Sequence, residues 1–386
     1  MAPHPPGTGT LQLGVFLPVA NNGWVLSSEA DPAPPTFALN RLIAQRAEAM
    51  GLHLLLAQSV WRGHGGETAF WDTSLEGFTL LAALAACTER LTLVASVPPL
   101  LYPPAVAAKM VATLDEVSGG RAGLNVVAGA HLAEYDQMGL LPTGYGSFRY
   151  DYADEWIGVV KALWGDGRLT HHGRFFDLDG CVSGPPPRRA PHPPIICAGT
   201  SERGMRFAVE HGTHAFIGTN TIGELAELCA RYRARAAAAG RTTPLQIFTA
   251  VNYLLAPSAG AAREAGAALP GPPRRGRHRR PGRPLLQPDA GASLRSLIVD
   301  SGEHVFYGGM VVGGPDEIAA HIAAVADAGL DGLLVTFTQW EAGLDLLERA
   351  VLPAVADRLA PAPPHPPPIP TPSRQPPAPA GAGGQP

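Results

Sequence analysis

The chain has 386 residues, of which 46% are hydrophobic and 16% charged, and its formal net charge is −4. This hydrophobic content suffices for the core of one large domain or two ordinary ones. The small net charge excludes a general attraction to nucleic acid or to an anionic membrane.

The N-terminus has no charged stretch followed by an apolar one, and no apolar run reaches the ~18 residues of a membrane span. The four cysteines are scattered, without C-x-x-C spacing or clustered histidines. They are therefore expected to be reduced and to bind no metal. These features predict a cytoplasmic protein.

Short apolar runs alternate along the chain with helical patterns, which is typical of parallel strand–helix units. The eight predicted strands cover 11–18, 53–59, 91–97, 123–129, 194–200, 214–219, 245–256 and 331–337. Eight such units predict an α/β fold of the TIM-barrel type, (β/α)8, in which ligands bind at the C-terminal ends of the strands. A doubly wound open sheet is the alternative, but no G-x-G-x-x-G follows the first strand.

The predicted barrel domain spans 11–359, after a flexible N-terminus at 1–10. Within it, 257–290 is expected to be irregular because it is rich in proline, glycine and arginine. That segment is either a divergent insertion or the product of a compensated frameshift in a GC-rich gene. The proline-rich tail at 360–386 is expected to be disordered and dispensable.

Asn125 lies in "GLNVVAG", a run that otherwise predicts a buried strand. A buried carboxamide without partners costs about 1–3 kcal/mol. Either neighbouring backbone satisfies it, or a ligand does. A carboxamide both donates and accepts hydrogen bonds, so it suits the edge of a heterocycle such as a flavin ring.

Arg149 and Ser201 each stand near the start of a predicted helix, in "SFRYDYADEW" and "CAGTSERGM". Arginine binds phosphate through two parallel hydrogen bonds, and the first amides of a helix attract anions. Together they predict a mononucleotide phosphate site. Separately, Arg149 could be a solvated surface charge and Ser201 only a helix cap.

The loop "QSVWRGHGGETAFWD" carries Gly63, Gly65 and Gly66, which allow the backbone to approach a ligand closely. His64 in this loop is a candidate base, although a lone loop histidine is more often exposed and inert. Cys197 has no adjacent histidine and is interpreted as a packing residue. No catalytic side chain or metal ligand is identified, which favours chemistry carried by a bound cofactor.

Six motifs occur together in one order: "FLPVANNGW", "RGHGGETAFWD", "SGGRAGLNVVAG", "AEYDQMG", "RYDYADEW" and "ICAGTSERGM". In this set the sequence resembles the bacterial-luciferase-like flavin-dependent monooxygenases, and among them most resembles the pyrimidine monooxygenases of the Rut uracil-degradation pathway. The resemblance covers about residues 11–256 and 308–357.

The resemblance implies a luciferase-type TIM barrel that binds reduced FMN and, with O2, oxygenates a small nitrogen heterocycle or amide-like substrate. An NAD(P)H-dependent flavin reductase is the implied partner that supplies the reduced flavin. No nucleic-acid or membrane partner and no metal is implied, and homo-oligomerisation is left open. The implied FMN contacts are Ser59, Val60, Asn125, Glu134, Arg149, Tyr150 and Ser201.

The sequence departs from the pyrimidine enzymes at several positions near this site. Val60 stands in place of a basic residue, Ala130 in place of a bulky tryptophan, and Pro98 and Pro99 in place of small and hydroxylated residues. Two alternatives therefore stand beside the monooxygenase. One is a deazaflavin-dependent oxidoreductase on the same barrel, and the other is a non-catalytic flavin-binding protein.

Overall fold

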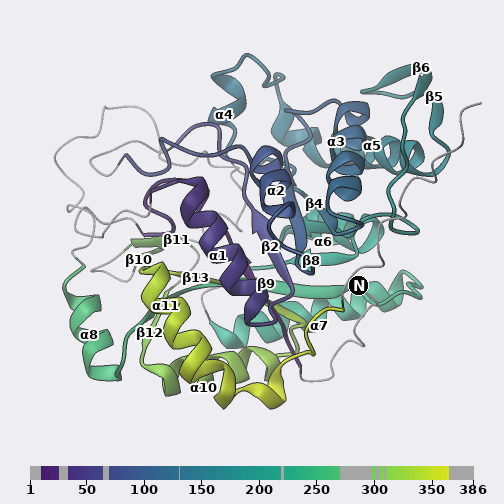
Figure 1. The fold of residues 1–386 in the computed structure, drawn as a ribbon. Helices are drawn as coiled ribbons and strands as arrows, with labels where there is room; N and C mark the ends of the chain where they lie inside the picture. The colour runs from purple at the N-terminus through teal and green to yellow at the C-terminus, as the bar shows by residue number, and fades with distance from the viewer. Residues whose placement is uncertain are drawn as a thin grey trace, which may run out of the picture.

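The computed structural model describes residues 10–25, 34–63, 69–129, 131–218, 221–269, 298–300, 305–307 and 310–364. Its centre is a closed barrel of eight parallel strands, and all eight strands predicted from the sequence are present (Figure 1). They are β1 (Gln12–Phe16), β2 (Leu54–Ala57), β3 (Thr92–Val97), β4 (Ala122–Val126), β7 (Ile195–Ala198), β8 (His214–Phe216), β9 (Gln246–Leu255) and β13 (Gly332–Phe337).

The barrel closes because β13 pairs with both β1 and β9, and β9 pairs in turn with β8. The open-sheet alternative is therefore excluded. The middle of the barrel is filled by apolar side chains: Leu54, Leu56, Val94, Ile196, Phe248 and Leu334. Burying these side chains away from water is the main force that holds the ring of strands together.

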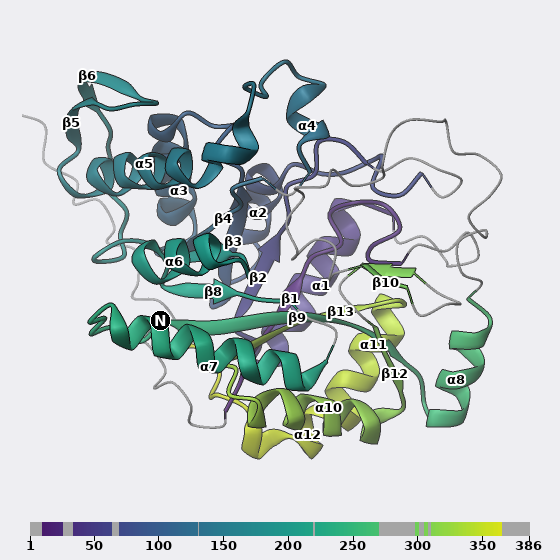
Figure 2. The same cartoon turned by 180° about the vertical axis from the view of Figure 1, so that it is seen from behind.

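Helices surround the barrel on the outside, as Figures 1 and 2 show from opposite sides. They are α1 (Phe37–Ala49), α2 (Gly77–Ala85), α3 (Pro104–Val117), α5 (Tyr145–Gly165), α6 (Glu202–His211), α7 (Ile222–Ala238), α10 (Pro315–Asp327) and α11 (Trp340–Leu346). Helix α5 shows why the helices pack against the barrel. Its buried residues recur every three or four positions: Ala153, Trp156, Val160 and Leu163. That spacing places one apolar stripe against the strands.

Further elements lie outside the eight units. An antiparallel hairpin, β5 (Arg168–His172) and β6 (Asp177–Val182), projects from the edge of the molecule after α5 (Figures 1 and 2). A second hairpin joins β10 (Ile298–Asp300) to β11 (Val305–Tyr307), and β12 (Met310–Gly313) pairs with β9. Short turns follow α11: η1 (Leu347–Val351), α12 (Leu352–Ala354) and η2 (Ala356–Arg358).

The segment 257–290 differs from the expectation in its first part. Helix α8 (Ala259–Ala267) forms there, because alanine favours helix and the Ser258 hydroxyl accepts a hydrogen bond from the Ala261 N–H. Residues 270–290, and residues 1–9 of the N-terminus, lie outside the described part of the chain.

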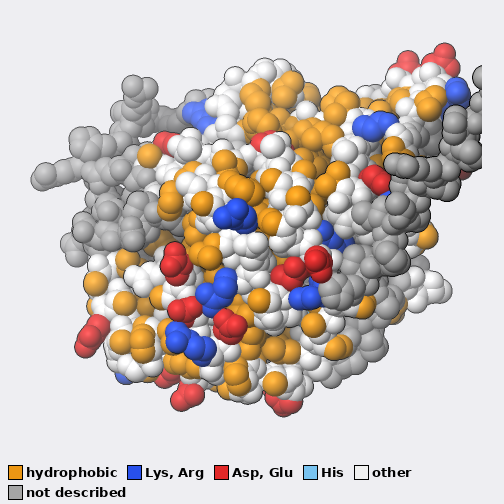
Figure 3. All heavy atoms as spheres, in the orientation of Figure 1, with side chains coloured by type: hydrophobic (Ala, Val, Ile, Leu, Met, Phe, Trp, Pro, Cys, Tyr) orange, Lys and Arg blue, Asp and Glu red, His pale blue; other side chains and the backbone are white. Residues whose placement is uncertain are grey.

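The chain surface mixes charges of both signs. On the face in Figure 3, basic and acidic side chains are interspersed. On α1, for example, Arg46 lies 2.9 Å from Asp345 and 2.7 Å from Glu348, which joins this helix to α11 and η1. Among the described helices, none has the length and apolar character needed to span a bilayer.

The expected disordered tail begins with residues that pack on the barrel. The Ala360 N–H donates a 2.8 Å hydrogen bond to the Leu11 carbonyl, and His53 Nε2 lies 2.9 Å from the Pro361 carbonyl. Proline lacks an N–H but keeps its acceptor, so a proline-rich stretch can still form such contacts. The first residues of the expected tail, 360–364, thus contact the barrel, whereas 365–386 lie outside the described residues.

These contacts predict different outcomes for two truncations. A chain ending at Leu359 should unfold with a free energy about 1–2 kcal/mol lower than a chain ending at Pro364, because it loses the Ala360 and Pro361 hydrogen bonds. Urea denaturation of both proteins measures the difference. Equal midpoints and slopes would show that 360–364 contribute nothing to stability.

Candidate functional site

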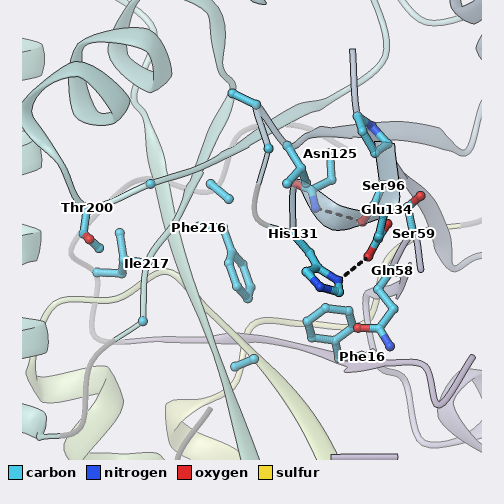
Figure 4. Close-up of a pocket in the computed structure, with 18 of the residues that line it drawn as sticks. Phe16, Gln58, Ser59, Ser96, Asn125, His131, Glu134, Thr200, Phe216 and Ile217 are labelled. Atoms are coloured by element: carbon cyan, nitrogen blue, oxygen red, sulfur yellow. Dashed lines mark hydrogen bonds and ion pairs between the residues drawn. The ribbon is translucent and has the colours of Figure 1, made fainter. Parts of the chain in front are cut away.

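The C-terminal ends of the barrel strands open into one cavity. In a parallel barrel these ends all meet at the same mouth, so side chains far apart in sequence are brought together there. The cavity wall includes Ser59, Ser96, Asn125, Phe216, Ala250 and Thr336. In Figure 4, Ser59 and Glu134 lie on one side of the cavity, and Thr200 and Ile217 on the opposite side.

Asn125 projects from β4 into this cavity wall and is 5% exposed. It shares a register position with Ser96 of β3, and its Nδ2 donates a 2.9 Å hydrogen bond to Ser96 Oγ (Figure 4). Its Oδ1 is buried and has no partner among the described residues. An acceptor left free in a cavity wall favours a ligand N–H at this point, rather than satisfaction by the fold.

Glu134, in the short helix α4 (Ala133–Asp136), is also buried in the cavity wall. Its carboxylate accepts a 3.3 Å hydrogen bond from the Trp61 N–H and lies 3.3 Å from His131 Nδ1. The Trp61 indole N–H donates to Ser59 Oγ at 2.9 Å. The loops after β2 and β4 are therefore tied together beside Asn125.

A second hollow lies between the first turns of α5 and α6 and adjoins the cavity. Arg149 and Tyr150 line both spaces, and Ser201 and Arg203 line the hollow. Ser201 caps α6 by accepting a 3.1 Å hydrogen bond from the Gly204 N–H. The two spaces form a route from the barrel mouth to a pair of helix starts.

Arg149 lines this hollow with its charge unpaired among the residues that the structure describes. It donates a 3.3 Å hydrogen bond to the Gly129 carbonyl and has no ion pair within the described ranges, whereas Arg203 is paired with Asp151. A guanidinium without an ion pair, beside the start of a helix, favours an anionic group.

Glycines at the start of α6 make room for Tyr150. A Cβ on Gly204 would come within 2.7 Å of the Tyr150 hydroxyl, and one on Gly199 within 3.2 Å. A side chain at Gly204 would therefore displace the Tyr150 hydroxyl, and one at Gly199 would crowd it.

The structure brings together six of the seven cofactor contacts expected from the resemblance. Ser59, Asn125, Glu134, Arg149 and Tyr150 line the cavity, and Ser201 lines the adjoining hollow. Val60 does not line either space. Its side chain packs in a cluster with Ala20, Trp24, Phe70 and Trp71, and its carbonyl accepts a 2.7 Å hydrogen bond from Ser74 Oγ.

Other cavity residues were not expected from the sequence, notably Ser96, His131 and Thr336. Ser96 could have been found from register, because it lies opposite Asn125 on the neighbouring strand. His131 lies three residues before Glu134, within reach of its carboxylate. His64, Gly65, Gly66 and Ala130 lie outside the described residues.

The family model for luciferase-like monooxygenases matches residues 11–332 of the chain. The protein named pyrimidine monooxygenase RutA of Serratia proteamaculans (strain 568) is 42% identical over 236 residues, which are 60% of this chain and 64% of that protein. The chain thus matches less than two thirds of that relative's length. RutA of Klebsiella variicola (strain At-22) is 34% identical over 372 residues, or 91% of this chain and 98% of that protein.

Among solved structures, riboflavin lyase RcaE with modified FMN and the substrate riboflavin superposes with a TM-score of 0.75. The match covers 92% of this chain and 94% of the other, at 24% sequence identity. Similarity at this level establishes the shared barrel fold.

Cys197, at the end of β7, is fully buried, as the packing interpretation expects. Burial raises the pKa of its thiol to about 12. Because the thiolate is the reactive form, iodoacetamide at pH 8 should leave Cys197 unmodified in the folded protein and alkylate the partly exposed Cys181. Peptide mass spectrometry before and after denaturation checks this, and rapid labelling of Cys197 in the folded state would contradict it.

Proposed function

Because the chain belongs to the luciferase-like monooxygenase family, we propose that it is the oxygenase of a two-component flavin system. It uses O2 and reduced FMN, and a separate NAD(P)H-dependent flavin reductase supplies the reduced FMN. Its substrate is a small nitrogen heterocycle of the pyrimidine type. The name shared by its RutA relatives supports this substrate class.

The observation that carries the proposal is the free Asn125 Oδ1 in a cavity that leads to the Arg149 hollow. A flavin mononucleotide has a heterocyclic ring with an amide-like edge at one end and a phosphate at the other. The cavity and the hollow offer matching groups in that order: a carboxamide first, and a cation beside helix starts second. The described residues therefore fit this cofactor.

The chain's own side chains would hold the flavin at three points. Asn125 and Glu134 would orient the ring, Tyr150 would flank the connecting chain, and Arg149 with the start of α6 would bind the phosphate. When bound, reduced FMN supplies the two electrons with which one atom of O2 enters the substrate and the other leaves as water. The protein's contribution is binding, orientation and exclusion of water.

Aromatic side chains close the part of the cavity away from Arg149. Phe16 and Trp24 have ring centroids 4.4 Å apart, and Trp24 and Trp71 have centroids 5.3 Å apart. An apolar wall of this kind keeps water from the reacting groups and offers flat faces to a planar substrate.

An oxygen-uptake assay tests the proposal as a whole. The protein, a flavin reductase, NADH, FMN and uracil should consume O2 and yield an oxygenated product, detected by mass spectrometry. Flavin binding without oxygen uptake would instead support the non-catalytic flavin-binding protein. Turnover only with a reduced deazaflavin, without O2, would support the oxidoreductase.

Arg149→Ala should weaken the binding of reduced FMN by about 1.5–3 kcal/mol, the scale of a lost charged hydrogen bond. Anaerobic titration of tryptophan fluorescence measures the affinity. Arg174→Ala is the matched control, because Arg174 is exposed and lies over the rings of Phe148 and Phe175 instead of lining the hollow. Equal flavin affinities for the two variants would remove Arg149 from the site.

Asn125→Ala should lower oxygenation roughly 100-fold, the scale of a lost preorganised hydrogen-bonding group. The free energy of unfolding should change by less than about 1 kcal/mol, because the variant loses a hydrogen bond but also an unpaired acceptor. Product yield and urea denaturation measure the two quantities.

Asn40→Ala is the control for Asn125→Ala. Asn40 is a fully buried asparagine whose Nδ2 donates to the Thr36 carbonyl at 2.9 Å, and it is not among the residues that line the cavity. It should keep its oxygenation activity per folded molecule. If Asn125→Ala also keeps its activity per folded molecule, Asn125 is a structural residue and not a flavin contact.

A further inference from the structure

A second buried asparagine–hydroxyl pair lies at the barrel mouth. Asn252 of β9 and Thr336 of β13 share a register position, and Thr336 Oγ1 donates a 2.9 Å hydrogen bond to Asn252 Oδ1. The two residues are 3% and 2% exposed, and Thr336 lines the cavity. We call them the far polar pair.

The far polar pair faces Ser96 and Asn125 across the barrel. In the ring of eight strands, β9 and β13 stand opposite β3 and β4. The proposed flavin contacts lie on β4 or follow β2, β4 and β7. Thr336, together with Ala250 and Val251 of β9, lines the side of the cavity that these contacts leave free. Asn252 follows Val251 and adjoins this lining as the hydrogen-bond partner of Thr336.

One atom of the far polar pair lacks a partner. Asn252 Nδ2 is buried and makes no hydrogen bond within the described part of the chain. Leaving such a donor unpaired costs about 1–3 kcal/mol, which an apolar side chain at this position would avoid. The complementary case is Asn125, whose free atom is the acceptor Oδ1.

Aromatic rings lie on the two strands that neighbour β13 and β9. Phe16 ends β1, which neighbours β13, and Phe216 ends β8, which neighbours β9. Both rings line the cavity, with centroids 6.1 Å apart at 85° (Figure 4). A flat ring placed here would meet aromatic surface and an amide donor together.

We propose that the far polar pair determines substrate specificity: Asn252 Nδ2 donates a hydrogen bond to a ring carbonyl of a pyrimidine, and Thr336 is the positioning residue that holds the Asn252 carboxamide in place. The assignment rests on the proposed function, because that function names the substrate class and places the flavin on the other side. It adds the residues that bind the substrate.

The test uses uracil as the probe. Asn252→Leu and Thr336→Val should each weaken uracil binding about 10-fold or more, measured by equilibrium dialysis with the full-length protein, with and without oxidised FMN. The KM for uracil should rise by the same factor, and FMN affinity should stay within about twofold of the wild type. Thr336→Ser, which keeps the hydroxyl, should retain uracil affinity.

Thr92→Val is the matched control. Thr92 is 6% exposed and lies on β3 four residues before Ser96, so it is placed nearer the end of the barrel opposite the cavity. Unchanged uracil affinity in Asn252→Leu, or an equal loss in Thr92→Val, would overturn the assignment. If Asn252→Leu does not fold, the contrast between Thr336→Val and Thr336→Ser decides.

The two proposals fail in different ways. Wild-type protein that binds FMN but not uracil would overturn the far polar pair and leave the flavin assignment standing. Wild-type protein that fails to bind FMN would contradict the proposed function. Equilibrium dialysis of uracil with the flavin-free protein would still test whether Asn252 and Thr336 bind the substrate.

Discussion

The hydrogen-bonding requirement of buried amides is the constraint that organises this molecule. Closing eight parallel strands into a ring gives their backbone N–H and carbonyl groups hydrogen-bond partners. The apolar side chains in the middle of the barrel need no such partners. At the C-terminal mouth, however, Asn125 and Asn252 each keep one amide atom without a partner among the described residues. The free energy gained by burying the apolar barrel middle offsets the cost of these unpaired atoms, which lie at the end of the barrel where ligands bind.

The hydrogen bonds between loops matter because loops alone would position the proposed cofactor contacts poorly. Trp61 donates its backbone N–H to Glu134, and its carbonyl accepts a 2.8 Å hydrogen bond from Gln137 Nε2. Tyr150 reaches the start of α6 through the space left by Gly199 and Gly204. Each contact fixes one loop or helix start against another, which is how a site becomes preorganised.

The strands were predictable because each is a short apolar run, and Asn125 stood out because it interrupts one of them. The β5–β6 hairpin was missed because its residues alternate between exposed and half-buried positions and lack an apolar run. Thr336 was missed because threonine is common in strands and its inward direction depends on register. Val60 was expected from the motif resemblance, through its backbone alone. Its side chain packs among aromatic residues, whereas the neighbouring Ser59 lines the cavity.

Two opposed amides make the cavity selective in a way that apolar packing alone does not. A ligand that fills the space but lacks an acceptor near Asn252 leaves that N–H buried and unpaired, at a cost of about 1–3 kcal/mol. A ligand that leaves a buried polar group unpaired is disfavoured by more free energy than a ligand that merely lacks one methylene group in an apolar pocket. The aromatic rings of Phe16 and Phe216 therefore admit flat molecules in general, and the far polar pair selects among them by their hydrogen-bonding edge.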